Sequence, residues 1–151
     1  MERVKIELGR ACDIEGWMKL VEQVKDDFPG LETGEAMAEH RDTVLAFMGR
    51  DSAICAKANG SVVGALLFSK ENSMLCFLAV DPECRRQHIA ENMDSFMLTC
   101  MEPGRDIVVT TYREGVPEGI AARAFYRRLG FSEGKLTEEF GSPVQELVLK
   151  R

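Results

Sequence analysis

Two adjacent arginines, Arg85 and Arg86, stand in a short polar loop and are the residues whose type and position best suit chemistry. The loop follows an apolar run and precedes a segment whose apolar residues recur at helical spacing. The first backbone N–H groups of a helix have no partner within the helix, and the helix dipole favours negative charge there. Because the arginines add positive charge beside that helix start, the arrangement predicts a site for a phosphate or a pyrophosphate.

The elements that must position this loop follow from the apolar pattern on either side of it. The run 74–80 holds seven apolar residues and no charge, which is typical of a strand covered on both faces. Asp81-Pro82 ends the run, because proline lacks a backbone donor and restricts the residue before it. Beyond the loop, one helical face carries Ile89, Met93, Phe96, Met97 and Cys100. Glu91 and Asp94 fall in the early turns of this helix, where acidic side chains suit the dipole.

The loop sequence RRQHIA, from Arg85 to Ala90, resembles the acetyl-coenzyme A loop of the GCN5-related N-acetyltransferase (GNAT) family, whose pattern is Gln/Arg-x-x-Gly-x-Gly/Ala. Val-Asp-Pro is a usual lead-in to that loop. Downstream, AFYRRLGF at 124–131 resembles the helix-to-strand junction of the same family, and Val62-Val63-Gly64 is similar to its third strand. The resemblance covers essentially the whole chain.

The resemblance implies an α/β fold with a mixed sheet, helices on both faces and the order β-α-α-β-β-β-α-β-α-β-β. In this family the fourth and fifth strands, here 74–80 and 107–112, separate so that the thioester enters between them. Local signals agree with the order. Asp13 can cap a first helix, and a second helix runs from about Gly34 to Gly49. Asn59-Gly60 predicts a type I′ hairpin turn, the last helix is expected over 119–129, and the final strand over 144–149.

Acetyl-coenzyme A is the co-substrate that the resemblance implies. Its pantetheine would pair with the backbone of Leu78, Ala79 and Val80, and the N–H of Val80 would polarise the thioester carbonyl. Its pyrophosphate would meet the backbone of Arg85, Arg86, Gln87, His88, Ile89 and Ala90. His88 stands where the family prefers glycine, although histidine tolerates unusual backbone angles better than most residues.

Tyr126, at the tyrosine of the AFYRRLGF segment, is the residue that the resemblance assigns as general acid. A phenol can protonate a thiolate as it leaves. The alternative is a tyrosine that only packs between helix and sheet. Gly119, seven residues earlier, stands where the family often has asparagine.

The general base is left open by the sequence. No carboxylate occurs in the strand 74–80, so a base within that strand is excluded. Glu114 and Glu139 are candidates, each also readable as an ordinary surface acid, and deprotonation through water is a third option. Cys84 could suggest a covalent acyl-cysteine, but a lone cysteine in the sequence is weak evidence for one.

The composition describes one domain, residues 1–151, large enough to bury a core. The net charge of −6 argues against a nucleic-acid partner. Five cysteines without a CxxC pair indicate reduced thiols in a cytoplasmic protein. Only two histidines occur, far apart, so no metal is expected. No signal peptide or run of membrane-spanning length is recognised.

Two functions are consistent with the sequence. The first is an acetyl-coenzyme A dependent N-acetyltransferase that acts by direct transfer on a primary amine of a small molecule or a protein, with room for a homodimer. The second is a non-catalytic acyl-coenzyme A binding domain, a sensor or regulatory module with the same fold. The departures at His88 and Gly119 keep the second function open.

Overall fold

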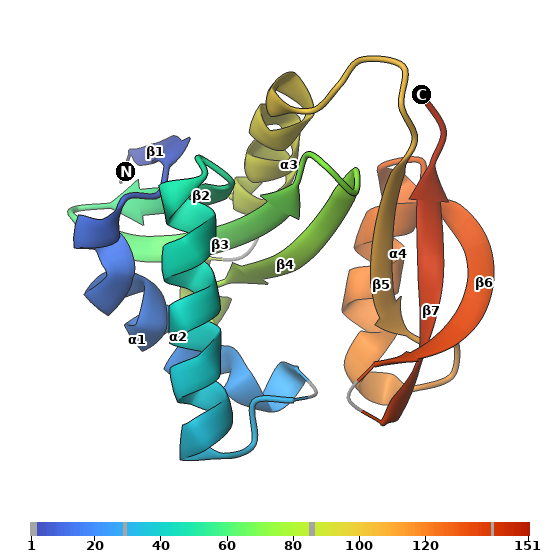
Figure 1. Cartoon of the computed structure of the whole chain (residues 1–151), viewed down its shortest axis with the longest axis horizontal. Helices are drawn as coiled ribbons and strands as arrows, with labels where there is room; N and C mark the ends of the chain where they lie inside the picture. The colour runs from blue at the N-terminus through green and yellow to red at the C-terminus, as the bar shows by residue number, and fades with distance from the viewer. Residues whose placement is uncertain (1–2, 29, 85–86, 140) are drawn as a thin grey trace.

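The computed structural model describes residues 3–28, 30–84, 87–139 and 141–151. Arg85 and Arg86 lie outside these ranges. Seven strands form one sheet in the order β1-β2-β3-β4-β5-β7-β6, and every neighbouring pair is antiparallel except β4 and β5 (Figure 1). The strands are β1 Val4–Leu8, β2 Ala53–Ala58, β3 Ser61–Ser69, β4 Met74–Val80, β5 Ile107–Tyr112, β6 Ser132–Glu139 and β7 Ser142–Leu149.

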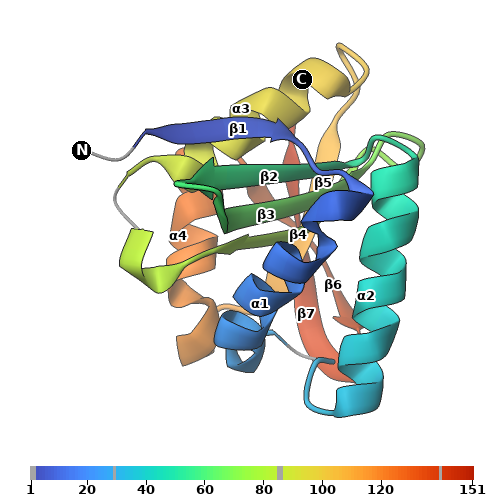
Figure 2. The same cartoon turned by 90° about the vertical axis from the view of Figure 1, so that its left-hand side faces the viewer.

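Within the described ranges, four α-helices cover the two faces of this sheet. They are α1 Ile14–Val24, α2 Gly34–Gly49, α3 Ile89–Cys100 and α4 Ile120–Arg128. Figure 2 shows α1 and α2 in front of the strands and α3 and α4 behind them. Short 3-10 turns at Ala11–Asp13, Lys25–Asp27, Pro82–Cys84 and Pro117–Gly119 complete the element list. The order β-α-α-β-β-β-α-β-α-β-β that the sequence predicted is confirmed.

Each face of the sheet has its own apolar core. On the α1 and α2 face, Trp17 is fully buried among residues from both helices and the middle strands. On the α3 and α4 face, Met93, Met97 and Phe68 are equally buried. Gly64 on β3 lets α3 approach closely, because a Cβ there would lie 2.9 Å from side-chain carbons of Ile89 and Met93.

Two local predictions have different outcomes. The turn at Asn59-Gly60 has positive φ at both residues, 52° and 80°, as a type I′ turn requires. The prediction that Asp13 caps α1 is wrong, because its side chain makes no capping bond. The Asp13 carboxylate instead accepts from the Arg10 N–H at 2.9 Å and lies 2.7 Å from Lys57 Nζ on β2. An ion pair with the sheet has replaced the helix cap. None of the helices in the described ranges combines the length and apolar character needed to span a bilayer.

Candidate active site

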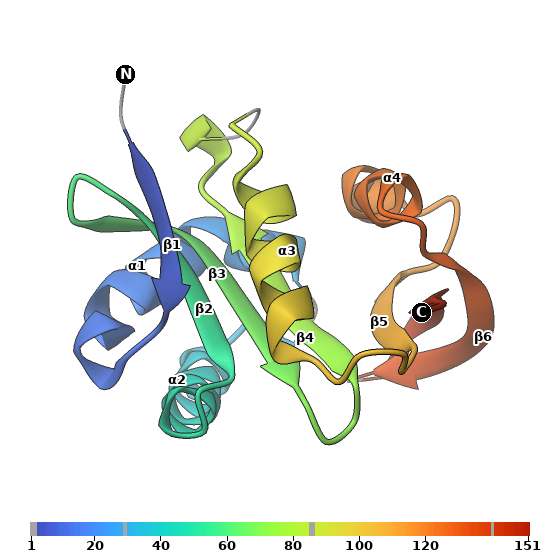
Figure 3. The same cartoon turned by 90° about the horizontal axis from the view of Figure 1, so that it is seen from above.

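The parallel strands β4 and β5 separate soon after they meet. Their register in the described chain consists of Met74 opposite Val108 and Leu75 opposite Val109. β5 pairs with β7 along its full length, whereas beyond Leu75 the edge of β4 that faces β5 has no strand partner in the described chain. Figure 3 shows the two strands diverging between α3 and α4. The predicted separation of 74–80 from 107–112 is therefore present.

A bulge in β4 coincides with the start of this divergence. On β3, Leu67 is opposite Phe77 and Phe68 is opposite Leu75, so Cys76 is an extra residue in β4. A bulge bends its strand and increases the local twist. Because the bulge directly follows the last residue paired with β5, it accounts for the change of direction.

The free edge of β4 offers backbone groups at alternate residues. The Asp81 N–H donates to the Val63 carbonyl at 2.8 Å, and antiparallel pairing alternates between residues that face the partner strand and residues that face away. Counting back along the register, Ala79 faces β3, whereas Val80 and Leu78 direct their N–H and C=O groups toward the divergence. Of the three predicted pantetheine residues, Leu78 and Val80 can thus pair with an extended ligand. Ala79 cannot do so through its backbone, since these groups face β3.

The loop before α3 brings His88 to the helix start. His88 is the N-cap of α3 and adopts the left-handed conformation, with φ 58° and ψ 25°. This is the region that glycine occupies without strain, so the backbone has the shape of the family's glycine while a side chain is present. The ring is exposed, and Nδ1 lies 3.1 Å from Glu91 Oε2. Gln87 is also exposed, Ile89 is buried and Ala90 is half-buried.

Tyr126 lies on the face of α4 that packs against the sheet. It is 6% exposed, belongs to the same core as Met93 and Met97, and meets the Phe131 ring edge-on at 5.6 Å between centroids. Burial, and after it the negative charge of Asp94, raises the pKa of Tyr126 above its ordinary range. The phenol therefore keeps its proton at neutral pH and is a weaker acid than free tyrosine.

Comparison with known proteins decides which family this geometry belongs to. Residues 49–133, more than half of the chain, match the family described as Acetyltransferase (GNAT) domain. The chain belongs to the GNAT family. A search among curated proteins finds no match.

Solved structures share the whole fold at low identity. A GNAT-family acetyltransferase from Bacillus cereus is 16% identical with a TM-score of 0.74, and the match covers 99% of this chain and 98% of that one. An N-acetyltransferase from Staphylococcus aureus is 14% identical with a TM-score of 0.75, covering 96% and 100%. The PaiA N-acetyltransferase of Thermoplasma acidophilum, solved in complex with coenzyme A, is 16% identical with a TM-score of 0.72, covering 99% of both chains.

The departure from the GNAT pattern at Gly119 has a packing cause. A Cβ at this position would lie 2.5 Å from the Cβ of Tyr112, the last residue of β5. No side chain fits there unless Tyr112 moves. The Tyr112 hydroxyl donates to the Asp27 carbonyl at 3.3 Å, on the α1 side of the sheet. The Tyr112 hydroxyl therefore reaches the α1 side of the sheet, whereas Tyr126 packs in the core on the α3 and α4 side.

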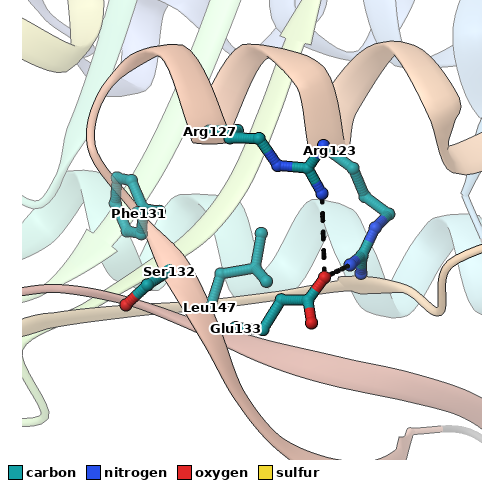
Figure 4. Close-up of a pocket in the computed structure, with 6 residues that line it drawn as sticks. All are labelled: Arg123, Arg127, Phe131, Ser132, Glu133 and Leu147. Atoms are coloured by element: carbon teal, nitrogen blue, oxygen red, sulfur yellow. Dashed lines mark hydrogen bonds and ion pairs between the residues drawn. The ribbon is translucent and has the colours of Figure 1, made fainter.

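A buried arginine ties α4 to the strands beside it. Arg123 is 6% exposed, and its Nη1 donates to the Tyr112 carbonyl at 3.0 Å and to Gln145 Oε1 at 2.9 Å. Its Nη2 donates to Glu133 Oε1 at 2.9 Å. Figure 4 shows this pair in a pocket between α4 and strands β6 and β7, where Arg127 approaches the same carboxylate. The pocket contains none of the predicted site residues, and its charges pair with one another, so its contacts fix the position of α4.

The two candidate bases have different surroundings. The Thr110 hydroxyl on β5 donates to Glu139 Oε2 at the end of β6. Partial desolvation, and then the charge of Glu139, raises the pKa of the Cys76 thiol on β4. Glu139 thus interacts with Thr110 on β5 and with Cys76 on β4, which locates its carboxylate at the divergence of the two strands. Glu114 is exposed in the turn after β5, and none of the described residues pairs with it.

An aromatic group on the α1 and α2 face was not predicted from the sequence. The Phe77 ring of β4 lies 4.7 Å from that of Phe28 and 4.9 Å from that of His40 on α2, between centroids. Burial lowers the pKa of His40, so the imidazole is neutral. The three residues come from segments far apart in the chain, and no local pattern connects them. Among the described residues, no group of three His, Cys, Asp or Glu side chains is placed so that it could hold a metal ion.

Proposed function

We propose that this protein transfers an acetyl group from acetyl-coenzyme A directly to a primary amine of a small molecule or a protein. The observation that carries the proposal is the free edge of β4, where Leu78 and Val80 direct backbone groups into the divergence from β5. That edge leads straight to the loop at the start of α3. The coenzyme A complex of the Thermoplasma acidophilum relative supports the choice of ligand.

The proposal assigns parts of this ligand to three places on the chain. Pantetheine pairs with the backbone of Leu78 and Val80 as an added strand would. The pyrophosphate meets the segment 85–90 at the positive end of α3. The Val80 N–H stabilises the negative charge that develops on the thioester oxygen, since a preorganised donor at that point favours the transition state.

The reaction then needs a base and an acid. Glu139, held by Thr110, takes the proton from the attacking ammonium group, directly or through water. The neutral amine nitrogen then forms a bond to the acetyl carbon while the bond from that carbon to sulfur breaks, and the nitrogen releases its second proton to solvent as the amide forms. Tyr126 gives its proton to the leaving thiolate.

A panel of amines tests the proposal. The protein is mixed with acetyl-coenzyme A and polyamines, amino acids, aminoglycosides or short peptides, and released thiol is measured. Turnover with a primary amine supports the enzyme. Binding of acetyl-coenzyme A, seen as a rise in Tm, without turnover of any amine supports the sensor instead.

A charge-reversal variant tests the position of the pyrophosphate. Arg85→Glu combined with Arg86→Glu should weaken binding of coenzyme A at least tenfold, because two positive charges near the phosphates become negative. Lys19→Glu with Lys70→Glu is the matched control, since it reverses two charges outside the predicted loop. Equal affinity in the wild type and the Arg85, Arg86 variant would remove the loop from the site.

A further inference from the structure

A pocket of about 310 Å³ lies between the segment that joins α1 to α2, the end of β5 and the start of β7. It shares no residue with the pocket beneath α4 in Figure 4. The proposed function uses none of the residues that line it. These residues are Lys25, Asp26, Phe28, Glu32, Tyr112 and Ser142.

Strand register places this pocket beside the proposed base. Ser142 lies opposite Glu139 in the pairing of β7 with β6, and the Glu139 carboxylate accepts a hydrogen bond from Thr110 on β5. Thr110 and Tyr112 are two residues apart, so their side chains leave the same face of β5, about 7 Å apart along the strand. Val109, at an alternate position, belongs to the core on the α3 and α4 side. The pocket and the Glu139 carboxylate therefore both lie on the α1 side of the sheet.

The pocket also adjoins the divergence of β4 and β5. The Phe28 ring lies 4.7 Å from the Phe77 ring of β4, between centroids. The Tyr112 hydroxyl of β5 donates to the Asp27 carbonyl at 3.3 Å. The segment before α2 thus contacts both diverging strands. An acceptor whose amine enters the divergence from this side has the rest of its chain beside the pocket.

The charged groups of the pocket leave an excess of negative charge. Asp26 and Glu32 are exposed carboxylates, and neither has a salt-bridge partner among the residues that the structure describes. The Gly30 N–H donates to Glu32 Oε1 at 3.0 Å and lowers the pKa of that carboxyl, so Glu32 is ionised at neutral pH. Lys25 Nζ lies 2.8 Å from Glu22 Oε1, so its positive charge is largely matched outside the pocket.

The pocket adds aromatic surface to this charge. The rings of Phe28 and Tyr112 form part of its lining. Partial burial, and after it the charges of Glu118, Asp27 and Glu32, raise the pKa of Tyr112, so the phenol stands in a negative field. Aromatic rings attract a cation through their negative faces, and carboxylates attract it through their charge. The lining therefore suits an alkylammonium group and disfavours a carboxylate.

We propose that this pocket selects acceptors that carry a second positive charge, diamines and polyamines, and holds that charge while the first amine is acetylated. The inference rests on the proposed function. The distance of about 7 Å along β5 from Thr110, which holds Glu139, to Tyr112 suits a short alkyl diamine. Its methylene chain lies against the Phe28 ring. Asp26 and Glu32 then determine specificity and take no part in bond making.

Three matched acceptors test the inference. The compounds α,ω-diaminobutane, pentylamine and ω-aminopentanoate carry an ammonium, a methyl and a carboxylate group at the end of the same alkyl chain. The wild-type kcat/KM for the diamine should exceed that for pentylamine about tenfold, the combined effect of exposed ion pairs and a cation–π contact. The aminopentanoate should be the poorest substrate of the three.

A double variant assigns the preference to the pocket. Asp26→Asn with Glu32→Gln should remove most of the preference for the diamine over pentylamine, and the change should appear in KM. Asp42→Asn with Glu39→Gln is the matched control, because it removes the same two charges from exposed positions on α2 and should keep the preference.

The outcomes separate the inference from the proposed function. Equal kcat/KM for the diamine and pentylamine in the wild type overturns the inference alone. A preference that survives the loss of both carboxylates does the same. Absence of turnover with every amine overturns the proposed function, and the inference with it.

Discussion

Replacing the buried Asp94 by asparagine should stabilise the protein at neutral pH. The pKa of Asp94 in the folded protein is about 6, against an ordinary 3.8. A raised pKa means that the folded state holds the proton more tightly than the unfolded chain does. The contribution of this group to stability is therefore complete below about pH 4 and is lost as the pH rises through 6.

The size of the loss follows from the two values. At 1.36 kcal/mol for each pH unit between them, ionised Asp94 costs the folded state about 3 kcal/mol at pH 7. The wild type should lose this amount relative to Asp94→Asn between pH 4 and pH 7.5. For a chain of this length, the difference corresponds to roughly 6–12 °C in Tm.

Urea unfolding at half-unit steps of pH measures the effect. Asp42→Asn on α2 is the matched control, because it removes the same charge from an exposed position, where substitutions change stability by about 0.5 kcal/mol or less. A difference between wild type and Asp94→Asn that does not vary with pH would refute the reasoning. It would mean that the carboxyl has a partner or reaches water in solution.

Three further predictions concern the acid, the base and the loop. Tyr126→Phe should keep the fold and the affinity for coenzyme A but lose on the order of 10²-fold in kcat. Tyr112→Phe should turn over normally, because the Tyr112 hydroxyl is bound to the Asp27 carbonyl. The reverse pattern would assign the role of general acid to Tyr112. Glu139→Gln should lower kcat and change the pH profile of turnover, while Glu114→Gln should do neither. If neither variant lowers kcat, water is the base. His88→Gly should bind coenzyme A more tightly in calorimetry, because glycine keeps the left-handed backbone and clears the approach to it; weaker binding would show that the imidazole contacts a phosphate.

The sequence predicted the central strand, the loop and α3 because each depends on neighbours in the chain. Seven apolar residues, Asp81-Pro82 and a helical apolar face are local signals, and the element bounds follow them. The turn at Asn59-Gly60 is predictable for the same reason. Asp13 does not cap α1 because its carboxylate binds the Arg10 N–H and also Lys57, which lies 44 positions away on β2. A local rule cannot anticipate an ion pair that only the sheet brings together.

The candidate site depended more on such distant contacts. Glu139 reaches the divergence through Thr110, 29 positions earlier, and the bulge at Cys76 is visible only in the register of β3 and β4. Asp94 is the clearest case. Its place early in α3 predicted an acid stabilised by the helix dipole, yet it lies in the second turn, where that effect has faded, and it is buried while Glu91 in the first turn is exposed. The apolar face that the sequence predicted for α3 is the buried one, but the sequence did not show that Asp94 is buried with it.

Gly119 and His88 first appeared as equal departures from the GNAT pattern, and the structure separates them. At Gly119, the Tyr112 side chain occupies the space that a further side chain would need. The Tyr112 carbonyl accepts a hydrogen bond from Arg123, which fixes the position of α4. The glycine is thus part of the contact that positions the helix of Tyr126, and it does not weaken the case for catalysis. At His88 the backbone already has the conformation of the expected glycine, so the remaining difference is an exposed imidazole beside the helix start. His88→Gly therefore tests whether that ring obstructs the pyrophosphate or binds it, whereas the panel of amines distinguishes an enzyme from a sensor.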